Sequence, residues 1–131
     1  MQRNLLSVLV VDDDPTARYA MARALRAAGF KTMEAASGAE ALEFAEYVSA
    51  VILDIHLPDL LGWEVCRLIR QKPGTSHLPV VHVSSRYVTD EDREKSRASG
   101  ADGYFTAPVD CEALVAHLDA LLSSSPGEAA A

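Results

Sequence analysis

Three aspartates stand where charged side chains could do chemistry. Asp12 and Asp13 come directly after an apolar run at residues 5–11, and Asp54 ends an apolar run at residues 50–53. Unbroken apolar runs are typical of strands buried on both faces of a parallel sheet. The three carboxylates would therefore lie at the carboxyl ends of strands, where open α/β sheets bind ligands.

Carboxylates gathered in one cleft repel one another unless a cation lies between them. Oxygen ligands with room for water suit Mg²⁺, and a carboxylate beside Mg²⁺ can attack a phosphoryl group. Ser84, at the end of another apolar run, could hydrogen-bond the phosphoryl oxygens. The simpler alternatives are that Asp12, Asp13 and Asp14 cap a helix and that Asp54 caps a loop. Because one aspartate is enough to cap a helix, the presence of the other aspartates favours a metal site.

Five strand-like segments alternate with five helix-like segments. The strands are expected at residues 5–11, 30–35, 50–54, 78–84 and 103–105. The helices are expected at residues 15–28, 37–45, 63–71, 89–99 and 111–122. Such alternation predicts an α/β, doubly wound fold, with a parallel sheet covered on both faces. In the strand order 2-1-3-4-5, the first and third strands are neighbours, which brings Asp12, Asp13 and Asp54 together.

The helix signals differ in strength. Asp14 fits the N-cap before Pro15, and Ser37 with Glu40 fits a capping box. The inward face of the first helix is expected to contain Ala17, Met21, Ala24, Leu25 and Ala28. The apolar stripe of the last helix contains Leu114, Val115, Leu118, Leu121 and Leu122. The fourth helix, opened by Thr89, has few apolar residues, so we expect it to be marginally stable and mobile.

The composition argues against several classes of protein. The 131-residue chain has a net charge of −7 and no basic patch, which argues against direct binding to nucleic acid or an anionic membrane. Cys66 and Cys111 match no metal spacing and are expected to be reduced thiols of a cytoplasmic protein. No apolar stretch is long enough to cross a membrane, and the N-terminus lacks the apolar part of a signal peptide. We expect one domain at residues 1–122 and a flexible tail or linker at residues 123–131.

Four segments, taken in order, resemble the receiver domains of bacterial two-component response regulators. They are VVDDDP with Asp12 and Asp13, LDIHLPDLLG with Asp54, PVVHVSS with Ser84, and GADGYF with Tyr104. The resemblance covers about residues 5–122 of the chain. It implies a flavodoxin-like (βα)5 fold, a three-layer sandwich.

The resemblance also implies the roles of the acidic residues. Asp54 would be the phospho-acceptor. Mg²⁺ would be bound by Asp13, Asp54 and the backbone carbonyl of His56, with Asp12 acting through water. Ser84 would contact the phosphoryl group through its hydroxyl.

Partners and output follow from the same resemblance. The phosphoryl donor would be a sensor histidine kinase or a histidine phosphotransfer protein. Tyr104 would be the aromatic switch that turns inward on activation. The surface of the fourth helix, fifth strand and fifth helix would then regulate a downstream protein or a fused output domain, and a homodimer through that region is compatible with the analogy. Such a domain is not an enzyme in the usual sense, since it catalyses only its own phosphorylation and dephosphorylation.

Ala107 departs from the family's pattern. The family usually has a lysine immediately before the proline that is Pro108 here, and that lysine pairs with the phosphoryl group. Its replacement calls into question the link between phosphorylation and the output surface. We hypothesise that Arg86 partly replaces the lysine; the alternative is that Arg86 is a solvated loop residue.

The second candidate function is a pseudo-receiver, a protein-interaction module that acts without phosphorylation. The resemblance also suggests a cis bond between Ala107 and Pro108.

The histidines are not expected to be site ligands, and the sequence does not favour two other kinds of reaction. His82 is interpreted as a satisfied sheet histidine rather than a ligand, and His77 and His117 as surface residues. The His56 side chain could tune hydrolysis of the phosphoryl group. It is not expected to bind the metal, because Mg²⁺ prefers oxygen ligands. A phosphatase with an aspartate nucleophile would need an acid where His56 stands. A nucleotide-binding protein would need a Gly-rich loop after the first strand.

Overall fold

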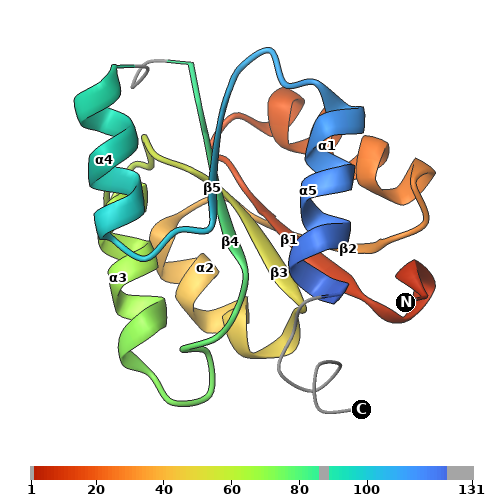
Figure 1. The fold of residues 1–131 in the computed structure, drawn as a ribbon, viewed down its shortest axis with the longest axis horizontal. Helices are drawn as coiled ribbons and strands as arrows, with labels where there is room; N and C mark the ends of the chain where they lie inside the picture. Colours follow the sequence, from red (N-terminus) through yellow and green to blue (C-terminus); the bar gives the residue numbers. More distant parts are fainter. Residues whose placement is uncertain (1, 86–88, 124–131) are drawn as a thin grey trace.

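Five parallel strands form one sheet that helices cover on both faces (Figure 1). The computed structural model describes residues 2–85 and 89–123. The strands, in the order β2-β1-β3-β4-β5, are β1 (Ser7–Val11), β2 (Lys31–Ala35), β3 (Ala50–Asp54), β4 (Val80–Ser84) and β5 (Gly103–Thr106). The helices are α1 (Pro15–Ala27), α2 (Gly38–Phe44), α3 (Gly62–Gln71), α4 (Asp90–Ala98) and α5 (Cys111–Ser123). The doubly wound α/β fold predicted from the alternation is confirmed.

The element boundaries differ from the expected ones at a few places. Leu5 belongs to a short 3-10 helix, η1 (Arg3–Leu5), and is exposed, so β1 starts two residues later than predicted. A second 3-10 helix, η2 (Ala45–Tyr47), follows α2. Ser123 closes α5 instead of opening the tail, and residues 124–131 lie outside the described part of the chain.

The strands alternate their side chains between two apolar cores. Leu9, Val51 and Leu53 face the core beneath α2 and α3. Val10 and Ile52 face the core beneath α1 and α5. Because the central strands are buried on both sides, their apolar runs show no polar alternation. The same burial fixes the register that aligns Val11 of β1 with Leu53 of β3.

The predicted N-caps of α1 and α2 are confirmed, and two other details of these helices differ from the prediction. The Asp14 carboxylate accepts from the Thr16 N–H at 3.1 Å, which confirms the predicted N-cap of α1. Ala17 is exposed because it lines a cavity together with Asp12 and Asp54, and Ala22 is buried with Leu25. Ser37 accepts from the backbone N–H of Glu40 as a cap should.

The expected capping box at α2 is incomplete. The Glu40 carboxylate accepts from the Ala36 N–H at 2.8 Å and not from the N–H of Ser37. Although the bond is displaced by one residue, the Glu40 carboxylate still provides a hydrogen-bond acceptor for the turn before the helix. A reciprocal capping box occurs at α4, between Thr89 and Asp92.

The C-terminal end of α4 is fixed by an arginine from α3. Arg70 donates from Nη1 to the Leu78 carbonyl at 2.6 Å and from Nε to the Gly100 carbonyl at 3.0 Å. Its Nη2 atom also contacts the Asp102 carboxylate at 2.9 Å. The guanidinium therefore joins the end of α3, the start of β4 and the turn between α4 and β5.

Candidate functional site

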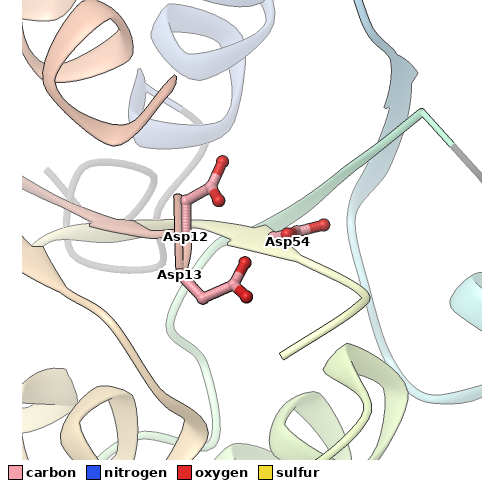
Figure 2. Close-up of side chains that lie close together, drawn as sticks. All are labelled: Asp12, Asp13 and Asp54. Carbon is pink, nitrogen blue, oxygen red and sulfur yellow. The ribbon is translucent and has the colours of Figure 1, made fainter. Parts of the chain in front are cut away.

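The three predicted aspartates meet at the carboxyl edge of the sheet. Asp12 and Asp13 follow β1, and Asp54 is the last residue of the neighbouring strand β3. A carboxylate oxygen from each lies within 4.8 Å of one from each of the others. Figure 2 shows the side chains projecting from the ends of these two strands. The strand order alone brings together residues about 40 positions apart in sequence.

The loop between β1 and α1 is shaped by its own acids. The Asp12 carboxylate accepts from the Asp14 N–H at 2.9 Å, and Arg18 of α1 donates to the Asp12 carbonyl at 2.9 Å. Asp14 performs the capping. Neither Asp12 nor Asp13 is needed as a cap, which leaves both for the cleft.

Burial and mutual repulsion make the cluster unfavourable for negative charge. Burial raises the pKa of Asp54 to about 6, and the charges of Asp12 and Asp13 add to the rise. Hydrogen bonds from the backbone N–H groups of His56 and Ile55 oppose it. Burial likewise raises the pKa of Asp12. Near neutral pH the ionised cluster would be stabilised by a cation.

The donor atoms of the cleft fit Mg²⁺. Carboxylate oxygens from three aspartates are the hard ligands that this ion prefers, and a cavity of about 380 Å³ leaves room for water. The same cavity is lined by His56, whose backbone N–H donates to the Asp54 carboxylate at 3.3 Å. The His56 side chain is exposed.

Ser84 lies next to the acidic cluster, and Tyr104 lies beside Ser84. Ser84 is buried at the end of β4 and lines the cavity with Asp54. The Tyr104 hydroxyl is also buried, and the Arg93 guanidinium lies 4.9 Å from the centre of its ring. Burial and the Asp92 charge raise the pKa of Tyr104, and the Ser84 side chain opposes the rise. The structure thus has the tyrosine ring beside Ser84 with its hydroxyl turned inward.

Ala107 lines the cavity opposite the acids and follows β5. Its peptide bond to Pro108 is cis, as the resemblance suggested. Among the described residues, the cavity lining contains no lysine or arginine. Arg86, the proposed substitute, lies outside the described residues. A second, mainly apolar cavity of about 380 Å³ adjoins the first and is lined by Met21, Val83 and Val109, among others.

Two supporting residues were not foreseen from the sequence. Asp59, in the loop after β3, accepts from the backbone N–H groups of Gly38 at 2.8 Å and Ala39 at 2.9 Å. These bonds lower the pKa of Asp59 and tie the loop to the N-terminus of α2. Gly62 packs against the backbone of Asp54, and an added Cβ would lie 2.7 Å from the Asp54 carbonyl oxygen. Only the turn-like composition of the loop hinted at such contacts.

Comparison with known proteins agrees with the geometry. The family model described as the response regulator receiver domain matches residues 8–119. The chain is 37% identical over 127 residues to the response regulator MprA of Mycobacterium tuberculosis, covering 95% of this chain and 54% of MprA. It is 32% identical over 120 residues to protein PilH of Pseudomonas aeruginosa, covering 88% of this chain and 97% of PilH. The chain therefore spans about half of one relative and nearly all of another.

A solved structure shares the fold. The receiver domain of the sensor histidine kinase PA1611 from Pseudomonas aeruginosa PAO1 superposes with a TM-score of 0.82 at 26% identity, covering 91% of this chain and 98% of that one. That structure is described as having a magnesium ion coordinated in its active-site cleft.

The fold, the acidic edge and these matches define a class of signalling domain, and the chain belongs to the response regulator receiver domain family. It is thus a receiver domain of two-component systems. Receiver domains generally bind Mg²⁺ at an acidic pocket and interact with histidine kinases and output domains. None of the helices in the described ranges is both long enough and apolar enough to cross a bilayer.

Proposed function

We propose that this receiver accepts a phosphoryl group on Asp54 from a histidine kinase or a histidine phosphotransfer protein. The observation that carries the proposal is the meeting of Asp12, Asp13 and Asp54 within 4.8 Å at one sheet edge, beside the buried hydroxyl of Ser84. A carboxylate oxygen of Asp54 attacks phosphorus, the new O–P bond forms, and the N–P bond to the donor imidazole breaks. Ser84 donates to an oxygen of the transferred group.

The metal site of the proposal uses the residues that the resemblance named. Asp13, Asp54 and the His56 carbonyl would hold Mg²⁺, and Asp12 would act through water. When bound, the ion supplies positive charge that offsets the charge developing on the phosphoryl group. We further propose that residues 1–122 form the functional domain, that it works in the cytoplasm, and that its α4-β5-α5 surface regulates a partner or fused domain, with Tyr104 as the switch.

Intact-protein mass tests the proposal directly. After incubation with acetyl phosphate and Mg²⁺, the protein should gain one phosphoryl group, and Asp54→Asn and a metal-free sample should gain none. Asp110→Asn is the matched control, because Asp110 is an exposed acid that accepts from the N–H groups of Glu112 and Ala113 at the start of α5 and does not line the cavity. That variant should be labelled like the wild type. If neither acetyl phosphate nor a phosphorylated kinase adds a phosphoryl group, the proposal is wrong.

The second candidate, a pseudo-receiver, is favoured by one observation. Among the described residues, no cationic side chain lines the cavity, where Ala107 replaces the family's usual lysine. A pseudo-receiver would bind its partner equally well as wild type and as Asp54→Asn. Partner binding that depends on phosphorylation would exclude this alternative.

A further inference from the structure

Helix α4 contacts the sheet through a buried serine hydroxyl and not through apolar side chains. Among its nine residues only Ser96 is buried, and the next buried residue is Ser99 at the C-cap. The helix sequence, DEDREKSRA, has no large apolar side chain. With so little apolar area to bury, the position of α4 depends on directional polar contacts.

His82 is the main polar contact beneath α4. Its side chain is completely buried in β4, with Nδ1 2.5 Å from the Ser96 hydroxyl and Nε2 3.0 Å from the Gly62 carbonyl oxygen. A carbonyl oxygen only accepts hydrogen bonds, so Nε2 carries the proton and Nδ1 accepts from Ser96. The neutral ring therefore joins the first residue of α3 to the C-terminal half of α4.

Gly62 connects this hydrogen-bonded pair to the acidic edge. Its N–H donates to the Ile55 carbonyl at 2.7 Å. A Cβ at Gly62 would lie 2.7 Å from both the Asp54 carbonyl oxygen and the Ile55 Cα atom. Gly62 is thus packed so closely that a movement of the backbone at Asp54 and Ile55 displaces its carbonyl group too.

We propose that His82 is a positioning residue that couples the backbone beside Asp54 to helix α4 through Gly62 and Ser96. The proposal rests on the proposed function, in which Asp54 gains a phosphoryl group. A hydrogen bond weakens steeply when its angle or length changes, so a small shift of the Gly62 carbonyl rotates the ring away from Ser96. Because α4 lacks apolar anchors and Arg70 holds only its C-terminal end, losing that bond changes the tilt of the helix on the sheet. This connection runs through α3 and does not require Ser84 or Tyr104.

A purely structural role for His82 makes a different prediction. If the ring only filled a polar space, removing the Ser96 hydroxyl would loosen α4 equally with and without the phosphoryl group. A coupling role requires the effect of phosphorylation on α4 to depend on that hydroxyl.

Amide hydrogen exchange at residues 90–98, before and after phosphorylation, separates the two roles. Ser96→Ala removes the bond to His82. Ser99→Ala is the matched control, because Ser99 is also buried and its hydroxyl donates to the Ser96 carbonyl at 2.6 Å, with no bond to His82. Both variants should exchange several-fold faster at α4. Phosphorylation should change α4 exchange about tenfold in the wild type and in Ser99→Ala, and less than twofold in Ser96→Ala. A wild-type response in Ser96→Ala, or no response in phosphorylated wild type, would overturn the proposal.

Mass spectrometry of the same samples distinguishes failure of the proposed function from failure of the coupling. If no phosphoryl group is added, Mg²⁺ alone serves as the probe, with its affinity measured by calorimetry. Coupling is reciprocal, so Ser96→Ala should then change the Mg²⁺ affinity at least threefold, and Ser99→Ala should leave it unchanged. Equal affinities in the wild type and Ser96→Ala would in that case reject the coupling.

Discussion

Helices α4 and α5 cover opposite faces of the same sheet and are attached to it in different ways (Figure 1). Helix α5 buries Leu114, Leu118 and Leu122 in the core that it shares with α1. Helix α4 buries only Ser96, which contacts His82. Apolar burial has no preferred direction and changes little with small movements, whereas a hydrogen bond is lost when its geometry changes. The comparison shows that α5 is anchored by apolar area and α4 by a directional bond, so a small movement of the sheet would affect α4 more than α5.

The largest expected effect lies in α5. Leu118→Ala should lower the free energy of unfolding by about 3 kcal/mol, because it leaves a cavity in a fully buried apolar cluster. Urea denaturation measures the loss. Leu121→Ala, at a half-buried position of the same helix, is the control and should cost about half as much. A loss below about 1 kcal/mol for Leu118→Ala would break the contrast with α4.

The second-largest expected effect is that the stability of α4 depends on pH. Burial lowers the pKa of His82 to about 4, against 6.5 for an exposed histidine, and the Gly62 carbonyl opposes the shift. The unfolded chain binds more protons between these values, so the stability that neutral His82 contributes is present above about pH 6.5 and is lost as pH falls through 4. From pH 7.5 to pH 5 the loss is about 2 kcal/mol.

Hydrogen exchange measures where that loss appears. After correction for intrinsic rates, the ratio of α4 to α5 exchange should rise at pH 5. His82→Gln removes the titrating ring and should abolish the pH dependence of the ratio. A ratio that changes equally in His82→Gln would mean that other groups loosen α4.

A smaller effect is expected from Ser96→Ala in the unphosphorylated protein. The change removes the donor to His82 Nδ1 and leaves a buried acceptor unsatisfied, which costs about 1 kcal/mol. The cost should appear as faster exchange at α4 with little change in α5. In the double variant His82→Leu with Ser96→Ala, the two costs should not add, because both variants remove the same bond. Additive costs would contradict the bond seen in the structure.

The smallest effect concerns the outer edge of α4. Lys95 lies 5.2 Å from the centre of the Trp63 ring of α3 and is half exposed. Lys95→Ala should cost about 0.5 kcal/mol, as exposed cation–π contacts do. Thermal unfolding of Lys95→Arg, which keeps the cation, provides the comparison. An effect larger than that of Ser96→Ala would show that surface contacts, and not the buried hydroxyl, hold α4.

The sequence predicted the parts of the molecule that depend on local pattern. Apolar runs located the central strands, and the strand order then placed Asp12, Asp13 and Asp54 together. The weak apolar pattern of α4 is matched by its single buried residue. His82 is confirmed as a satisfied sheet histidine. The strands, the α4 pattern and His82 follow from side-chain type and spacing along single segments, and the meeting of the aspartates follows from the strand order of a doubly wound sheet.

What escaped prediction depends on contacts between distant segments. The partners of His82 are 14 and 20 residues away and come from two different helices. The prediction that His117 is a surface residue is wrong in part: the ring is half-buried, contacts Phe105 edge-on and bonds the Asp102 carbonyl at 2.9 Å. His77 is exposed as expected. The residue type predicts that a buried polar side chain needs a hydrogen-bond partner. The packing of helices and strands determines which group that partner is.

The arginine that fixes Gly100 makes the end of α4 a pivot. A nine-residue helix is about 13 Å long, so a tilt of about 10° around that end moves the opposite end by about 2 Å. Such a tilt would leave the surface beside Gly100 in place and would shift the surface beside Thr89. A protein that touched both ends of α4 would therefore contact the same residues in both positions of the helix. Only the distance between its two contact points would change.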